Sequence, residues 1–228
     1  MSQAEMTFWD HLEDLRKSLF RMIAVFVVTV VALFFFKDIL FDDVILAPSK
    51  SDFFLYRLLG TDFSMSLVNL EVAAQFMIHM KVTFVSALIL TFPYHIYEVW
   101  RFVAPALYEN EKTAVRKAFA FASFLFYLGV IVAYAFLFPL MLNFFAGYQV
   151  SPDVPNTFSL TSYISLFTST VLTFGIVFEF PTVVVALSAL GVLTKDTLAS
   201  FRKHAILVVV VLAAVITPSG DPFSMLVV

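Results

Sequence analysis

Residues 98–112, EVWRFVAPALYENEK, gather three glutamates with tryptophan, tyrosine and arginine in a chain that has few charges. Carboxylates and aromatic rings in one short stretch are residue types that could form a docking surface. The same residues also suit a structural turn, because Glu109 and Glu111 would stand in the first turn of a helix after Pro105, where the helix dipole favours acids. From the residues alone, a docking surface and a polar turn both remain open.

A second candidate for chemistry is Glu179, which interrupts the apolar run FGIVFEFP at residues 174–181. A carboxylate inside a membrane span costs about 2.5–3.5 kcal/mol on insertion scales, so it normally faces protein or water. Helical geometry places small and polar residues on the same stripe as this acid. They are Ser165, Thr168, Gly175 and Thr182. We therefore predict an intramembrane polar pocket of Glu179, Thr168 and Ser165. The alternative is a protonated Glu179 that hydrogen-bonds to a neighbouring helix.

A third motif is HLEDLRKSL at residues 11–19, in which Leu12, Leu15 and Leu19 follow helical spacing with charged residues between them. This pattern is typical of a short amphipathic helix on a membrane surface, and we predict one at residues 1–17. An ordinary interfacial anchor explains the pattern as well as a binding site does.

The residues and motifs that several other kinds of chemistry require are absent from this sequence. There is no cysteine, which excludes disulfides and thiolate catalysis. No phosphate-binding glycine loop, HExxH motif or nucleophile elbow occurs, and His79 and His95 do not have the spacing of metal ligands. We expect no enzyme activity, no cofactor, no metal and no nucleic-acid partner.

The composition indicates which elements must position these residues. Of 228 residues, 61% are hydrophobic and 14% are charged, and the mean hydropathy is +0.94. A soluble domain would be about one quarter charged, so we predict an all-α integral membrane protein with one domain over residues 1–228. A span needs about 20 apolar residues. The predicted spans are 18–36, 74–100, 118–142, 163–190 and 205–216, joined by loops at 37–73, 101–117, 143–162 and 191–204, with an outer turn at 217–228.

The last two predicted elements are unusual. The fifth span, residues 205–216, is short, so it requires a thinner bilayer or shielding by neighbouring helices. The motif ITPSGDPF at residues 216–223 predicts a tight turn, in which Asp221 would cap the next helix. The apolar residues after this turn end at Val228, as a truncated sixth span would.

The cations predict the orientation of the spans. Most of the fourteen Lys and Arg residues lie on one side: Arg16, Lys17, Arg21, Arg101, Lys112, Arg116, Lys117, Lys195, Arg202 and Lys203. Because cytoplasmic loops are enriched in cations, the N-terminus and the 101–117 loop should face the cytoplasm. The acidic start and the absence of a small-residue cleavage site predict that the first span is retained. Lys81 should extend to the opposite interface.

Four of these stretches occur together in one family. WRFVAPALYENEK resembles the first cytoplasmic loop of the TatC family, the multi-span core of the twin-arginine protein translocase, and HLEDLRKSL resembles its N-terminal helix. FGIVFEFP is similar to that family's fourth span, and ITPSGDPF to its turn between spans five and six. The resemblance covers nearly the whole chain. It implies a six-span concave helical bundle, with the sixth span truncated at residue 228.

The resemblance implies a receptor that binds Arg-Arg signal peptides at its cytoplasmic face, for export of folded proteins. Phe102 and Glu111 correspond to the family's binding residues in the first loop, with Leu107 and Tyr108 beside them. Arg16 matches the family's arginine in the N-terminal helix. Asp14 stands where the family often has Glu, and the second carboxylate is either Asp14 or its neighbour Glu13.

The resemblance also extends to the membrane interior and the outer face. Glu179 matches an acid that faces a concave membrane pocket in the family. Thr217 matches a polar position linked with partner contacts, Asp221 lies in the adjoining turn, and Met225 stands where many relatives have Gln. The implied partners are signal peptides, single-span TatA/TatB-type subunits, further copies of the chain and the lipid bilayer. The implied location is the cytoplasmic (inner) membrane of a bacterium or archaeon.

Two other classes of function compete with a receptor. A proton-coupled secondary transporter of a small solute would also carry prolines and an acid within its spans. Against it, the sequence shows no internal repeat of two matching halves. A scaffold subunit is the third class, and specific peptide binding would separate a receptor from it.

Overall fold

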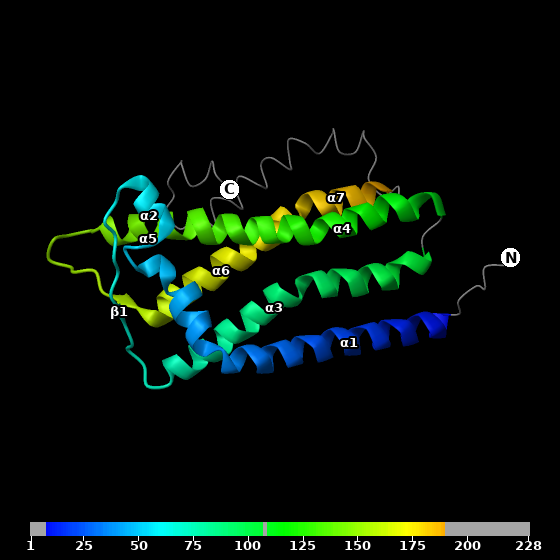
Figure 1. The fold of residues 1–228 in the computed structure, drawn as a ribbon, viewed down its shortest axis with the longest axis horizontal. Helices are drawn as coiled ribbons and strands as arrows, with labels where there is room; N and C mark the ends of the chain where they lie inside the picture. Colours follow the sequence, from blue (N-terminus) through cyan, green and yellow to red (C-terminus); the bar gives the residue numbers. More distant parts are fainter. Residues whose placement is uncertain (1–7, 107–108, 190–228) are drawn as a thin grey trace.

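The computed structural model describes residues 8–106 and 109–189, which form long helices that run along a common axis (Figure 1). Four helical stretches are long and apolar enough to cross a membrane: His11–Phe35, Ala74–Val103, Val115–Gly147 and Leu160–Ser188. The prediction of a helical membrane bundle is confirmed. The predicted fifth and sixth spans lie outside the described residues.

The helices and strands follow one another along the chain with short connections. In order they are α1 (Phe8–Phe35), the π-helical η1 (Ile39–Ile45), the 3-10 turn η2 (Ala47–Ser49), α2 (Phe54–Leu59), β1 (Leu67–Val68), α3 (Ala74–Val103), the 3-10 turn η3 (Ala104–Ala106), α4 (Glu109–Val132), the π-helical η4 (Ala133–Leu137), α5 (Phe138–Gly147), β2 (Phe158–Ser159), α6 (Leu160–Phe178) and α7 (Phe180–Ala189). The two strands pair in parallel, Leu67 with Phe158 and Val68 with Ser159.

The first helix differs from its prediction. Residues 8–17 do not form a separate surface helix, since they continue without a break into the first span as α1. No proline or glycine interrupts this stretch, and Glu13 and Lys17 form an ion pair of 2.9 Å at i,i+4 spacing, which supports a helix. The leucines that suggested a surface helix, Leu12, Leu15 and Leu19, are exposed on α1.

Prolines shape the other spans. α3 continues past residue 100 until Ala104-Pro105 ends it. The third predicted span runs through α4, η4 and α5, and its π-helical turn lies just before Pro139. The fourth predicted span is divided into α6 and α7 at Glu179. Pro181 has no N–H to bond the carbonyl of Val177, which accounts for the break.

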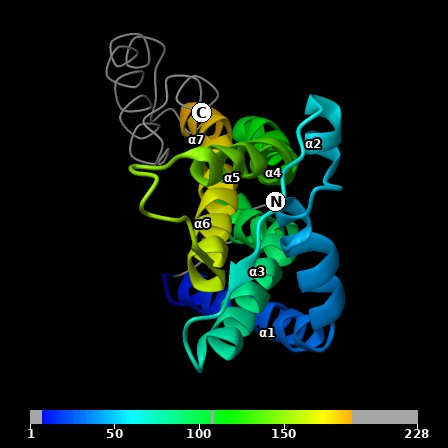
Figure 2. The ribbon, with the colours of Figure 1, turned by 90° about the vertical axis from the view of Figure 1, so that its left-hand side faces the viewer.

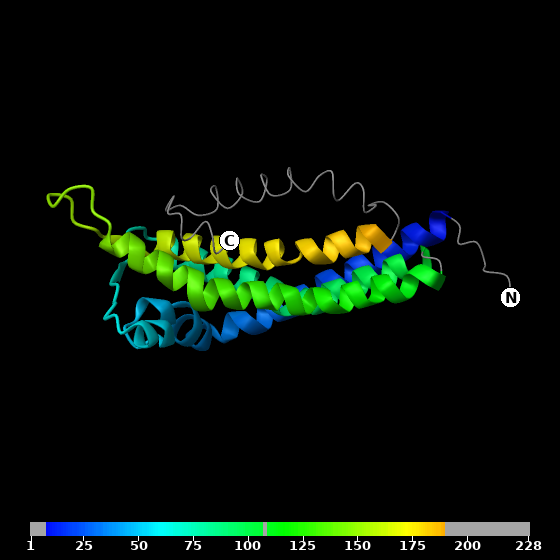
Figure 3. The ribbon, with the colours of Figure 1, turned by 90° about the horizontal axis from the view of Figure 1, so that it is seen from above.

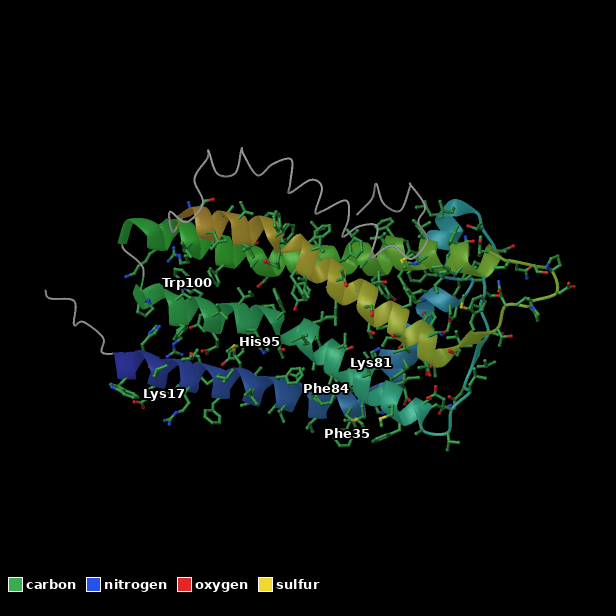
Figure 4. All side chains as sticks on the ribbon, turned by 180° about the vertical axis from the view of Figure 1, so that it is seen from behind. Lys17, Phe35, Lys81, Phe84, His95 and Trp100 are labelled. Atoms are coloured by element: carbon green, nitrogen blue, oxygen red, sulfur yellow. The ribbon has the colours of Figure 1, made fainter. Side chains whose placement is uncertain are left out.

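α1 and α3 pack antiparallel along most of their lengths (Figure 1). The rings of Phe34 and His79 are stacked with centroids 4.2 Å apart, and Phe26 and Phe84 lie 5.8 Å apart farther along the pair. Phe84 is labelled on α3 in Figure 4. Each contact joins a residue of α1 to one of α3, so the position of α1 is set largely by α3.

Glycine permits a close contact between α4 and α6. A Cβ added to Gly129 of α4 would lie 2.5 Å from the backbone oxygen of Phe174, and one added to Gly175 of α6 would lie 2.7 Å from Cε2 of Phe126. Small residues let membrane helices approach in this way. α6 also packs against α3, and it therefore joins α4 to the α1–α3 pair (Figures 2 and 3).

Tyrosines fix the connection between α1 and α3 at the end that holds η1 and η2. The Tyr163 hydroxyl donates to the Ile45 carbonyl at 2.6 Å, and the Tyr56 hydroxyl donates to the Pro48 carbonyl at 2.8 Å. Burial raises the pKa of Tyr56, so its phenol stays protonated and keeps donating at neutral pH. These bonds satisfy carbonyls that would otherwise be buried without a donor.

Tyr163→Phe should therefore lower stability by about 1–3 kcal/mol, since the Ile45 carbonyl loses its donor in a buried site. Thermal unfolding of the purified protein in detergent measures this effect. Tyr148→Phe is the control, because Tyr148 is exposed. Equal melting temperatures for the two variants would show that the Tyr163 bond contributes nothing.

Candidate functional site

Two predicted motifs meet at one end of the bundle, where α1 begins, α3 ends and α4 begins (Figure 1). We call this the Phe102 end. The rings of His11 from α1 and Phe102 from α3 are stacked, with centroids 4.3 Å apart and planes 23° apart. Both side chains are half-buried. The stack brings HLEDLRKSL and WRFVAPALYENEK into direct contact although they are far apart in the sequence.

The side of α1 that meets α3 carries a polar stripe. His11, Asp14, Ser18 and Arg21 are three or four residues apart, which places them on one face of the helix. His11 contacts Phe102 at one end of this stripe, and Ser18 is buried in its middle. Asp14 lies between them and is exposed. The stripe thus places Asp14 about one helical turn along α1 from the His11–Phe102 contact.

The most extensive polar cluster surrounds Glu98 of α3, which is 1% exposed. Arg21 binds it with two hydrogen bonds, from Nε to Oε1 at 3.0 Å and from Nη2 to Oε2 at 2.8 Å. The Tyr94 hydroxyl donates to Oε1 at 3.1 Å, and Arg101 Nη1 lies 3.9 Å from the same oxygen. Arg21 Nη2 also donates to Ser18 Oγ at 2.9 Å. This cluster connects α1 to α3 next to the stripe.

The sequence contains a signal for this cluster. Arg21 and Glu98 are opposite charges near the same ends of two successive predicted spans. Successive spans are usually antiparallel neighbours, so two such charges at matching depth are expected to pair.

The two candidates for the second carboxylate have different surroundings. Glu13 pairs with Lys17 at 2.9 Å, and both side chains are more than half exposed. Asp14 lies on the stripe that faces α3, seven residues before Arg21. Arg16 is exposed and lies two residues from Asp14, about 200° around the helix. Asp14 is thus the carboxylate that lies nearest the Phe102 side of α1.

The loop residues are only partly described. The backbone of Glu111 lies in the first turn of α4, but its side chain is outside the description, as are Leu107 and Tyr108. Trp100, labelled in Figure 4, packs its ring 5.7 Å from that of Phe119. This contact packs α4 against α3, and the first turn of α4, with the backbone of Glu111, lies at the Phe102 end (Figure 1).

The three residues of the predicted intramembrane pocket have different surroundings, although Thr168 Oγ1 lies 3.3 Å from the Ser165 carbonyl oxygen. Ser165 is exposed and accepts a hydrogen bond from Lys81 Nζ at 3.4 Å, which joins α6 to α3 (Figure 4). Thr168 is buried, bonds to the Ile164 carbonyl of its own helix, and lines an apolar groove of 420 Å³. Glu179 lies at the junction of α6 and α7. Ser165 and Glu179 do not line that groove.

Glu179 is half-buried at this junction. Its Oε1 atom is buried without a hydrogen-bond partner among the residues described, and so is Oγ1 of Thr182 one turn later. The predicted partner-contact residues Thr217, Asp221 and Met225 lie outside the described residues. Within residues 8–106 and 109–189, no three His, Asp or Glu side chains are placed to hold a metal ion.

Comparison with known proteins identifies the family. A sequence model of the Sec-independent protein translocase protein TatC matches residues 10–228. The chain belongs to the TatC family. A TatC protein of Blattabacterium sp. subsp. Periplaneta americana is 36% identical over 239 residues, which cover 98% of this chain and 90% of the relative. A TatC protein of Halalkalibacterium halodurans is 31% identical, with 96% of this chain and 81% of the relative covered.

Solved structures support the same assignment. The crystal structure of a twin-arginine translocase receptor, TatC, in DDM superposes with a TM-score of 0.73 at 31% identity, over 95% of this chain and 91% of that one. The chain is therefore a multi-pass membrane component of a Sec-independent protein translocase. This agrees with the resemblance inferred from the four motifs.

Proposed function

We propose that this TatC-family chain binds signal peptides with two consecutive arginines at its Phe102 end and delivers folded proteins for export. The observation that carries the proposal is the His11–Phe102 stack. It supports a site formed by Asp14, on the α1 stripe, and Glu111, whose backbone lies in the first turn of α4. Two carboxylates on separate helices at the Phe102 end could each bind one of the two arginines of a signal peptide.

The two carboxylates of the proposed site should bind arginine more tightly than lysine. A guanidinium is planar, always charged and able to donate two parallel hydrogen bonds to one carboxylate, whereas an ammonium acts as a point charge. The chain already contains such a pair, because Arg21 binds Glu98 through two nitrogens. The exposed rings and leucines of α1, including Trp9 and Leu12, would contact the apolar part of the peptide.

The proposal includes an orientation and partners. The Phe102 end carries the cations of the 101–117 loop, so it faces the cytoplasm of a bacterium or archaeon and the chain lies in the inner membrane. Single-span TatA/TatB-type subunits and further copies of the chain complete the translocase. Glu179, Thr168 and Ser165, with Thr217, Asp221 and Met225, are the residues through which membrane partners would be bound.

Asp14→Asn should weaken binding of an Arg-Arg signal peptide by roughly 10–100-fold, the loss expected for one charge-assisted hydrogen bond. Glu13→Gln is the matched control and should stay within about 3-fold of wild type, because Glu13 is already paired with Lys17. Fluorescence anisotropy with a labelled peptide and the detergent-purified protein measures both variants.

The same peptide with two lysines tests the function itself. Wild type should bind the Arg-Arg peptide at least about tenfold more tightly than the Lys-Lys peptide, since only guanidinium makes two bonds to one carboxylate. Equal affinity for the two peptides would contradict the proposed receptor function. Loss of binding in Glu13→Gln but not in Asp14→Asn would exchange the roles of the two acids.

A further inference from the structure

Arg21 carries the same chemical group as the peptide that we propose this end binds. It lies on the α1 stripe seven residues after Asp14, which is two helical turns or about 10 Å along the axis. Since seven residues correspond to nearly two full turns, the two side chains leave the helix in almost the same direction. The guanidinium of Arg21 therefore lies on the same face of α1 as Asp14, the acid that we propose binds an arginine of the signal peptide.

The Arg21 side chain extends toward Asp14. Side chains of a helix lean toward its N-terminus, which for Arg21 is the direction of Asp14. Nη2 of Arg21 already donates to Ser18 Oγ at 2.9 Å, and Ser18 is one turn closer to Asp14. The Arg21 side chain is 36% exposed, so part of it lies at the surface of α1. A rotation of this side chain along the surface of α1 would bring the two charges together.

Glu98 holds Arg21 in a different place. It binds the guanidinium from α3 through both carboxylate oxygens, at 3.0 and 2.8 Å, and is itself 1% exposed. Tyr94 supports the carboxylate with a hydrogen bond of 3.1 Å. An ion pair with two hydrogen bonds to a buried carboxylate is stronger than an ion pair with an exposed carboxylate such as that of Asp14. Arg21 therefore stays with Glu98, and the Asp14 carboxylate is left exposed.

We propose that Glu98 sequesters Arg21 and so prevents it from occupying Asp14 in place of the arginine of a signal peptide. Glu98 and Arg21 are positioning residues in this scheme, because neither touches the peptide. The inference rests on the proposed function and adds a regulatory contact to that site. The proposal gives the ion pair near the Phe102 end a function: Glu98 keeps Arg21 from binding Asp14 in competition with the peptide.

A plain packing role for the pair makes a different prediction. If Glu98 and Arg21 serve only to hold α1 against α3, removing both should disturb the Phe102 end at least as much as removing Glu98 alone. If Glu98 sequesters Arg21, removing Glu98 alone releases a competitor, and removing Arg21 as well abolishes the competition. The double variant separates the two roles.

The experiment measures Arg-Arg peptide affinity and melting temperature for Glu98→Gln, Arg21→Gln and the double variant, in the full chain. Glu98→Gln should bind the peptide about tenfold more weakly than wild type, whereas the double variant and Arg21→Gln should stay within about threefold. Glu98→Gln and the double variant should both melt below wild type, since both lack the ion pair. Glu98→Asp, which keeps the charge, should bind more tightly than Glu98→Gln.

Three outcomes would overturn the inference. They are wild-type affinity in Glu98→Gln, a double variant as weak as Glu98→Gln, and affinity losses that follow the melting temperatures in all variants. If Glu98→Gln does not fold, the comparison of Glu98→Asp with Glu98→Asp/Arg21→Gln gives the same test. A wild type that does not prefer Arg-Arg to Lys-Lys peptide contradicts the proposed function, which distinguishes that failure from a failure of the sequestration.

Discussion

Gly129→Ala should prevent α4 and α6 from packing at their present distance and should leave little folded protein in the membrane. A Cβ at this position would lie 2.5 Å from the Phe174 backbone oxygen and 2.9 Å from two atoms of the Phe178 side chain. A backbone atom in the middle of α6 has no free rotation by which to move away. We expect a loss of about 3 kcal/mol or more, at or beyond the upper end of overpacking effects.

The chain offers two matched controls for this prediction. Gly147→Ala introduces the same methyl group where no atom lies within 4 Å, so its melting temperature should be unchanged or slightly higher. Gly175→Ala should be intermediate, because its Cβ would meet the edge of the Phe126 ring, which has some freedom to shift. Thermal melting and membrane yield of the three variants give the ranking. Equal yields for Gly129→Ala and Gly147→Ala would contradict the close packing of α4 and α6.

Glu111→Gln should reduce Arg-Arg peptide affinity by roughly 10–100-fold and should reduce the preference over a Lys-Lys peptide. The substitution keeps the size of the side chain and removes only its charge, at the first turn of α4. Because the proposed site holds two guanidinium groups with two acids, loss of either acid should reduce affinity by a similar factor.

Glu109→Gln is the control for Glu111→Gln. Both acids lie in the first turn of α4, so both interact with the helix dipole and a purely structural effect would appear in both variants. We expect Glu109→Gln to keep the peptide affinity of wild type within about threefold. Equal losses in the two variants would assign the effect to the helix start and not to a peptide contact.

The membrane bundle could be predicted from composition and hydropathy, because a helix that crosses lipid must be apolar over most of its length. The ends of the helices were less predictable. Residues 8–17 continue into the first span as α1, since charged residues such as Glu13 and Lys17 stabilise a helix as well as they mark an interface. The break at Glu179 follows from Pro181, but its place depends on how the neighbouring helix accommodates the bend.

The candidate site was predictable in its motifs but not in its contacts. The resemblance indicated that the N-terminal helix and the first loop act together, and the His11–Phe102 stack places them side by side. The pairing of Arg21 with Glu98 joins residues 77 positions apart and depends on which faces of two helices meet. Hydropathy alone does not determine those faces. For the same reason the sequence did not show that Ser165 and Glu179, which helical geometry places on one stripe, lie in different surroundings.

The link between Arg21 and Glu98 also sets an order for biogenesis. α1 leaves the ribosome first, and its arginine has no acid on α3 to bind until 77 more residues are made, roughly 4–15 s at usual elongation rates. During this interval the nascent first helix holds a solvated cation at the membrane surface. The first helix therefore gains this contact only after α3 has been made and lies beside it.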